Sequence, residues 1–225
     1  MKHLTETPET DRSIRQIASK LINQIITNPS ELITGTVDIR MSDNKIRRIP
    51  VGYIKTSFPD LVIGYIVAPR GDTSAAFVYK LKGKTTTIPS NIKFIIAYPL
   101  HGYWNNFEKV NFNINNLIDE IKSEKDIFVH EFVHYWDFSH MIGKDPNHTS
   151  GFGSDYFNSV LERNAYYHEG INSLENSNID LSLPFKKFMK KAMKFFNWDF
   201  LSHLSEQNKK RLITRLYALW SEKQR

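Results

Sequence analysis

The residues of this chain with the clearest chemistry lie close together, at His130, Glu131 and His134. They form the pattern His-Glu-x-x-His. On an α-helix, residues four apart project from one face about one turn apart. Both imidazoles can therefore bind one metal ion, while the glutamate lies beside the water that the ion holds. Zinc lowers the pKa of such a water to about 7, and a carboxylate accepts the proton as the water attacks a carbonyl. The motif predicts a zinc-dependent hydrolase with Glu131 as general base.

The segment 126–140 around this motif is predicted to be a buried helix, because it is apolar nearly all round. Charged and imidazole groups are costly in such a place unless they are paired or bind a metal. The alternative interpretation is a pair of core histidines that are satisfied by hydrogen bonds, with Glu131 at the edge of the helix.

A catalytic zinc ion needs a third protein ligand and an open fourth position. Two residues compete for the third position. Glu162 lies on a second predicted helix, 155–169, and borders an apolar stripe on that helix. His140 follows His130 by ten residues.

Residues 127–140 resemble the active-site helix of the zincin metallopeptidases, and the order of elements over about 60–170 resembles the upper lobe of that fold. The resemblance implies a peptidase that acts on a peptide or protein substrate and uses Zn²⁺. It also implies an edge strand beside the cleft, where an extended peptide pairs with the sheet. The strand predicted at 93–99 or the one at 75–81 would play that part.

The resemblance also bears on the third ligand. Glu162-Arg163-Asn164-Ala165 is similar to the E-x-x-A stretch of gluzincins, in which a downstream helix supplies a glutamate, and the small Ala165 would let two helices approach closely. His140 matches the last histidine of the metzincin pattern, but Asp137 stands where that pattern has a glycine that a sharp bend needs. No clear Met-turn follows. We therefore favour Glu162 as the ligand and keep His140 as the alternative.

Two further roles remain to be filled. Asp137 lies on nearly the same helix face as the two histidines and is either an acceptor that orients a ligand imidazole or a surface acid. A group that stabilises the oxyanion is also required. Tyr166, one turn after Glu162, is our first choice, and the other eligible residues are Tyr156, Tyr167, His140, His148 and His168.

The order of the helices and strands that must position these residues predicts an α+β, zincin-like fold. A helix is expected over 11–28, followed by a twisted, mainly antiparallel sheet of four or five strands packed on the active-site helix. Further helices are expected at 114–121, 155–169, 184–197 and 206–222, with a polar loop over 170–183. We predict a single domain, 1–225, made of an N-terminal helix (1–34), the sheet with the active-site helix (35–140) and a helical lower lobe (141–225).

The amino-acid composition excludes several classes of protein and of metal site. The chain has 225 residues and no cysteine, which excludes disulfide scaffolds, thiol nucleophiles and cysteine-ligated zinc modules. Zinc would have to be held by histidine and carboxylate, the chemistry of open, catalytic sites. No apolar run is long enough to span a bilayer, and the first twelve residues lack the apolar region of a secretory signal. A cytoplasmic or virion-associated protein is expected, with an Ile- and Asn-rich composition that suits a phage.

The net charge of +6 is partly concentrated in the predicted helix at 184–197, which carries five lysines among apolar residues: Lys186, Lys187, Lys190, Lys191 and Lys194. These lysines form either a solvated helix face or a surface for an anionic partner. No nucleic-acid-binding module is recognisable. A second hypothesis of another class is a binding or assembly component, for example of a phage particle or a regulatory system, that keeps the fold with little turnover.

Overall fold

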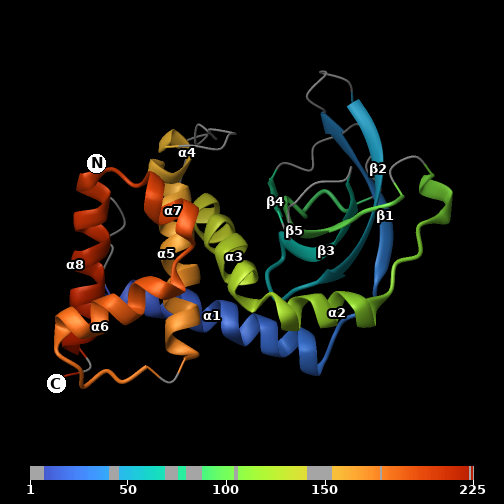
Figure 1. Cartoon of the computed structure of the whole chain (residues 1–225). Helices are drawn as coiled ribbons and strands as arrows, with labels where there is room; N and C mark the ends of the chain where they lie inside the picture. The colour runs from blue at the N-terminus through green and yellow to red at the C-terminus, as the bar shows by residue number, and fades with distance from the viewer. Residues whose placement is uncertain are drawn as a thin grey trace. The chain divides into compact units, whose positions relative to one another are not determined.

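The computed structural model describes residues 8–40, 46–68, 76–79, 88–103, 106–140, 154–177, 179–222 and 224 (Figure 1). Its contacts divide the chain into two compact units. One runs from Ala18 to Tyr135, and the other combines the residues up to Ile17 with Trp136–Arg225. The division falls inside helix α1 (Pro8–Thr27) and inside helix α3 (Lys125–His140). Among the described residues, no helix is both long and apolar enough to cross a lipid bilayer.

The first unit contains a five-stranded mixed sheet in the order β1-β2-β3-β5-β4. The strands are β1 (Ile33–Arg40), β2 (Ile46–Lys55), β3 (Leu61–Val67), β4 (Ala76–Tyr79) and β5 (Phe94–Leu100). Only β3 and β5 pair in parallel, whereas the other three pairings are antiparallel. The predicted α+β class and mainly antiparallel sheet are confirmed at this level.

The sheet order decides between the two predicted edge strands. Strand β4 lies at the end of the sheet, so the segment predicted at 75–81 contains an edge strand. The alternative over 93–99 is wrong, because β5 is hydrogen-bonded on both sides, to β3 and to β4. A parallel pair needs a crossover connection, and here β4 lies within that connection.

Strand β3 lies in the middle of the sheet and is buried at every residue. A Cβ atom at Gly64 would lie 2.1 Å from the carbonyl oxygen of Gly52 and 2.7 Å from Cα of Tyr53. Backbone atoms cannot move aside as a flexible side chain can, so only glycine allows this close approach. This unit contains a buried apolar core, which is formed by Val37, Ile49, Val51, Tyr53, Val62, Ile66, Val67, Ile88, Ile92, Ile95 and Ala97.

The remaining helix of this unit is α2 (Ile114–Ser123), which follows the short 3₁₀ turn η1 (Phe107–Lys109). The side chain of Asn113 caps its first turn by accepting a hydrogen bond of 2.9 Å from the backbone N–H of Asn115. Leu117, Ile118 and Ile121 form its buried face, as the spacing predicts.

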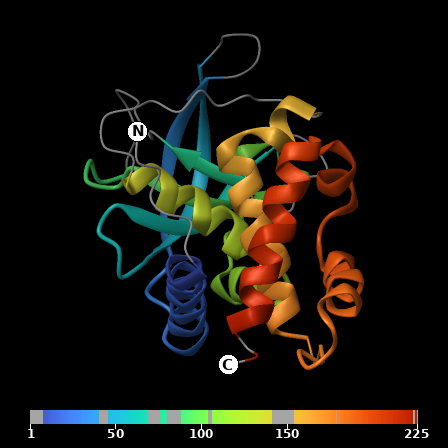
Figure 2. The same cartoon turned by 90° about the vertical axis from the view of Figure 1, so that its left-hand side faces the viewer.

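The second unit is built from helices α4 (Ser154–Asn158), α5 (Val160–Glu175), α6 (Phe185–Ala192), α7 (Trp198–His203) and α8 (Glu206–Glu222), with the 3₁₀ turn η2 (Met193–Phe195) after α6 (Figure 2). Their apolar faces share one core: Phe157, Tyr167, Ile171, Leu174, Phe188, Ala192, Phe196, Phe200, Leu204, Leu212, Leu216 and Leu219. The five lysines of 186–194 lie on α6 and η2 and are exposed, while Phe188 and Ala192 of α6 are buried. Their anionic partner remains a prediction.

The helices of this unit differ from the prediction in three places. The single helix expected over 155–169 is interrupted at Ser159, whose backbone is extended (φ −60°, ψ 151°). Residues 170–175, expected to be part of a polar loop, continue helix α5, and Gly170 lies in this part of the helix where Phe196 approaches closely. A Cβ atom there would lie 2.4 Å from Cδ1 of Phe196. Helix α7 was not expected, although Asn197 caps it by accepting hydrogen bonds from two backbone N–H groups.

Candidate metal centre

Helix α3 is anchored to the sheet unit by its aromatic face. Phe128 and Phe132 are fully buried and stacked, with ring centroids 6.4 Å apart, and Phe132 also packs against Phe58 at 5.7 Å. The hydroxyl of Tyr135 donates a hydrogen bond of 3.0 Å to Oδ1 of Asp60. Residues 128, 132 and 135 lie on one side of a helix. These contacts therefore fix the rotation of α3 and with it the direction of the histidine pair.

His130 and His134 lie one above the other on α3, as the spacing predicts. Their side chains are 6 % and 4 % exposed, and their Nε2 atoms are 3.2 Å apart. Two nitrogens bound to a tetrahedral zinc ion at about 2.0–2.1 Å would lie about 3.3 Å from each other. The same separation also suits a hydrogen bond between imidazoles in opposite tautomers. The geometry of the pair is thus compatible with a shared cation.

Glu162 completes a group of three ligands. One atom from each of His130, His134 and Glu162 lies within 4.8 Å of the others, and all three residues are buried, Glu162 with 4 % exposure. A carboxylate and two imidazole lone pairs all attract a cation, and water competes poorly for them in a buried site. The chemistry of this donor set fits zinc, which is bound by two histidines and one glutamate in one class of catalytic sites.

The start of α5 is capped without the carboxylate of Glu162. Ser159 caps the helix, and its Oγ accepts a hydrogen bond of 3.2 Å from the backbone N–H of Glu162. In a complete capping box, the glutamate side chain would in turn accept from the backbone N–H of the cap residue. Here that N–H donates to the carbonyl oxygen of Tyr156 at 3.1 Å. The cap therefore does not need the carboxylate.

Glu131 is 9 % exposed and lies on α3 between the two histidines. Its negative charge raises the pKa of Tyr98 on β5, whose side chain is fully buried. Burial, followed by the charges of Glu124, Glu120 and Glu131, raises the pKa of Tyr98 far above its usual value. The phenol therefore stays protonated. Nothing in the sequence distinguishes Tyr98 except its position in the apolar strand β5.

The structure places the alternative ligand differently. His140 is exposed, its Nδ1 atom lies 2.8 Å from the carbonyl oxygen of Trp136, and its ring stacks on the Trp136 ring at 4.2 Å. Within the described part of the chain, the only group of three metal-ligating side chains is the one that contains Glu162. His140 is not a member of it.

The residues considered for the oxyanion have other contacts in the helical unit. The ring of Tyr166 stacks on Phe200 at 5.1 Å and packs against Phe157 at 5.3 Å. Tyr167 lies under the guanidinium of Arg215, at 3.4 Å from the ring centroid. His140 contacts Trp136, Tyr156 packs edge-on against Phe157, and His148 lies outside the described residues. The role of Tyr166 stays a prediction.

His168, the last of these residues, is fully buried, and its Nε2 atom lies 3.5 Å from Oδ1 of Asp11. Burial lowers the pKa of His168 to about 4, which outweighs the attraction of Asp11, and Arg215 and Arg15 lower it further. At neutral pH this imidazole is therefore neutral.

The pKa of His168 predicts a pH-dependent stability. An unfolded histidine binds its proton near pH 6.5, and the folded one near pH 4, so the stabilisation is complete above about pH 6.5 and is lost as the pH falls toward 4. Between pH 7 and pH 5, His168 should account for a loss of about 2 kcal/mol in the free energy of unfolding. Urea unfolding at the two pH values measures this loss, which should be smaller in His168→Gln and unchanged in the exposed-site control His203→Gln. An equal loss in His168→Gln and in the native sequence would contradict the assignment.

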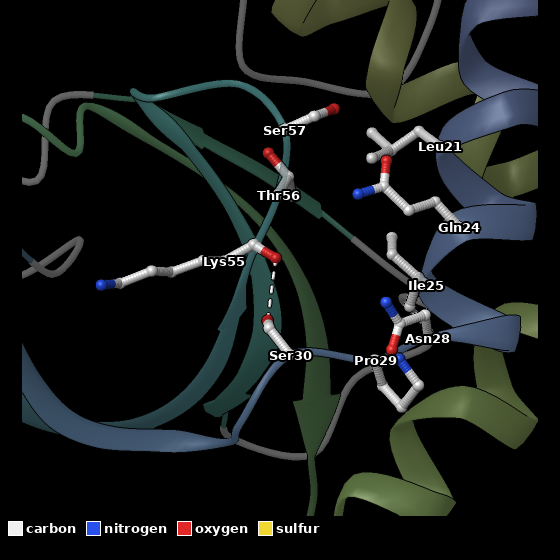
Figure 3. A pocket seen from close by; sticks show the side chains of 9 residues that line it. All are labelled: Leu21, Gln24, Ile25, Asn28, Pro29, Ser30, Lys55, Thr56 and Ser57. Carbon is white, nitrogen blue, oxygen red and sulfur yellow. Dashed lines mark hydrogen bonds between the residues drawn. The ribbon is translucent and has the colours of Figure 1, made fainter.

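A separate pocket of about 290 Å³ lies in the sheet unit, between the second half of α1 and the end of β2 (Figure 3). The side chains of Gln24 and Leu21 face Thr56 and Ser57 across it, and the chain of Lys55 points away from them. Ser30 Oγ donates a hydrogen bond of 3.0 Å to the carbonyl oxygen of Lys55. None of the predicted site residues lines this pocket, so it is distinct from the candidate metal centre.

Comparison with known proteins adds no family to this description. No protein-family model, no curated protein and no solved structure matches the chain. The centre is therefore described by its own residues: a buried His-His-Glu group in an α+β protein, with the spacing of the HExxH…E pattern.

Proposed function

We propose that this protein is a zinc-dependent hydrolase, and specifically a metallopeptidase of the zincin type, with His130, His134 and Glu162 as metal ligands. The observation that carries the proposal is the convergence of the three buried ligand atoms within 4.8 Å. Two of them come from one helix and the third from another, so local sequence alone does not bring them together. A donor set of this kind, with no cysteine, is typical of catalytic zinc and not of closed structural sites.

The proposed roles follow from charge and position. Zinc, when bound, supplies a positive charge that polarises a carbonyl and makes a coordinated water acidic. Glu131, adjacent to a ligand histidine, is the general base that removes a proton from the attacking water. Tyr166 is kept as the candidate for stabilising the oxyanion.

A peptide is the substrate class that this arrangement favours. Strand β4 lies at the edge of the sheet and pairs with only β5 among the described residues. An extended peptide can add to such an edge through backbone hydrogen bonds. The resemblance of residues 127–140 to zincin peptidases supports the same substrate.

The test begins with protein that carries no histidine tag. We expect one zinc ion per chain by elemental analysis, cleavage of some members of a peptide library, and loss of that cleavage on chelation with recovery when zinc is restored. Absence of bound zinc after reconstitution would overturn the metal site. Stoichiometric zinc with no cleavage of casein or of the library would favour a binding or assembly component over a peptidase.

A further inference from the structure

Asp137 and Asn164 connect the two helices that carry the proposed ligands. Nδ2 of Asn164, on α5, donates a hydrogen bond of 3.0 Å to Oδ2 of Asp137, on α3. Both residues belong to the helical unit. Asp137 follows His134 by three residues, and Asn164 follows Glu162 by two. This hydrogen bond therefore lies close in sequence to the proposed ligands on both helices.

The amide of Asn164 is held in one orientation. Its Oδ1 accepts hydrogen bonds of 3.3 Å from both Nη1 and Nη2 of Arg215 on α8. A guanidinium only donates, and an ionised carboxylate only accepts, so a group between Arg215 and Asp137 must present an acceptor to one and a donor to the other. An amide does this, whereas a carboxylate or an apolar side chain of similar size does not.

Arg215 is itself fixed by its surroundings. Nη2 donates to Oδ2 of Asp11 at 2.7 Å, and the guanidinium lies 3.4 Å above the ring of Tyr167. The side chains of Arg215 and Asp11 are 12 % and 7 % exposed. Charge-assisted hydrogen bonds in such a buried place are strong and directional. The chain Asp11–Arg215–Asn164–Asp137 therefore ties α1, α8, α5 and α3 together.

Helix geometry shows what this connection controls. At about 100° per residue, Glu162 and Asn164 lie about 160° apart around α5, on opposite sides of the direction of Ala165. On α3, by contrast, His130, His134 and Asp137 lie within an arc of about 60°. A rotation of α5 about its axis that broke the hydrogen bond between Asn164 and Asp137 would therefore also turn the side chain of Glu162.

We infer that Asn164 is a positioning residue, which sets the rotation of α5 about its axis and so directs the carboxylate of Glu162 toward the metal position. This inference rests on the proposed zinc site. Arg215, itself bound by Asp11, donates hydrogen bonds to Asn164. Asn164 in turn donates to Asp137 on α3.

The test compares zinc affinity, measured by competition with a chromophoric chelator, in variants that keep the ligands. Asn164→Leu should lower the affinity by about tenfold or more, as losses of partners outside the first coordination shell do. Substitution with Co²⁺ should give a changed absorption spectrum in the same variant, because the ligand geometry changes. Asp137→Asn should stay within about threefold of the native affinity, since an amide oxygen still accepts from Asn164.

Arg15→Gln is the matched control. Arg15 also ties α1 to α5, through hydrogen bonds of 3.0 and 2.9 Å to Glu175, but it does not touch Asn164 or Asp137. It should lower the unfolding temperature without changing zinc affinity or the Co²⁺ spectrum. If Asn164→Leu changes the zinc affinity and the Co²⁺ spectrum no more than Arg15→Gln does, the role of Asn164 is only structural and the inference is overturned.

If Asn164→Leu does not fold, Asn164→Asp and Arg215→Lys are measured in its place, and native zinc affinity in both would overturn the inference. A native protein that binds no zinc would instead overturn the proposed function itself.

Discussion

Glu131→Gln should abolish hydrolysis while zinc remains bound at one ion per chain. Glutamine has nearly the same shape as glutamate and fills the same buried space, but its amide does not accept a proton from water. Loss of a general base typically lowers a rate by about 10²–10⁴-fold. Because Glu131 is a neighbour of the proposed ligands and not one of them, the metal content should be unaffected. The measurement pairs elemental zinc with the initial rate on a peptide taken from the library digest.

The matched control is Glu124→Gln, at the residue that directly precedes α3. Glu124 precedes Glu131 by seven residues and lies between α2 and α3, where its carbonyl oxygen accepts a hydrogen bond of 2.9 Å from the backbone N–H of Phe128. Its partial burial raises its pKa, and it contributes to the field at Tyr98, as Glu131 does. We expect Glu124→Gln to keep both zinc and turnover. Turnover of Glu131→Gln at the native rate would contradict the mechanism, and loss of its zinc would mean that Glu131 belongs to the metal site.

Glu162→Ala should weaken zinc binding by at least about 100-fold, more than the loss of an outer partner, because it removes a charged ligand. His140→Ala should leave zinc binding unchanged. His140 is exposed and already engaged with Trp136, through its Nδ1 atom and by stacking. Competition with a chelator, carried out side by side on the two variants, separates the two ligand sets predicted from the sequence.

The opposite result for these two variants would identify His140 as the third ligand. Loss of zinc in His140→Ala with native affinity in Glu162→Ala would mean that the third ligand is the histidine on α3 itself. Glu162→Gln provides a further check on the role of charge. The amide oxygen is a weaker ligand than a carboxylate, so this variant should bind zinc more weakly than the native protein and more tightly than Glu162→Ala.

The sheet and most helices could be predicted because their patterns are local. Each strand shows a β-branched or aromatic run between turn residues, and the buried faces of α1, α2 and α8 show helical spacing. The predicted helix boundaries are wrong where a residue makes a tertiary contact or a helix cap that the local pattern does not show. The polar composition of 170–183 indicated a loop, but residues 170–175 are helical, and Gly170 makes room there for the ring of Phe196. Ser159 begins a new helix in the middle of a continuous apolar pattern.

The polar chain from Asp11 to Asp137 has no sequence signature. Its members lie on four helices, and the hydrogen bond between Arg215 and Asp11 joins positions at opposite ends of the chain. An isolated asparagine or arginine on a helix is normally a solvated residue. Only the packing of the helices makes Asn164 a partly buried bridge between the donor Arg215 and the acceptor Asp137.

The sequence by itself determined the pair of histidines and the glutamate beside them. Their relative positions depend on the pitch of a single helix, which every α-helix shares. The choice between Glu162 and His140 as the third member of the group was left to the tertiary structure. Both residues have suitable chemistry, but proximity between separate helices depends on how their side chains pack, and His140 projects into solvent whereas Glu162 is buried with the pair.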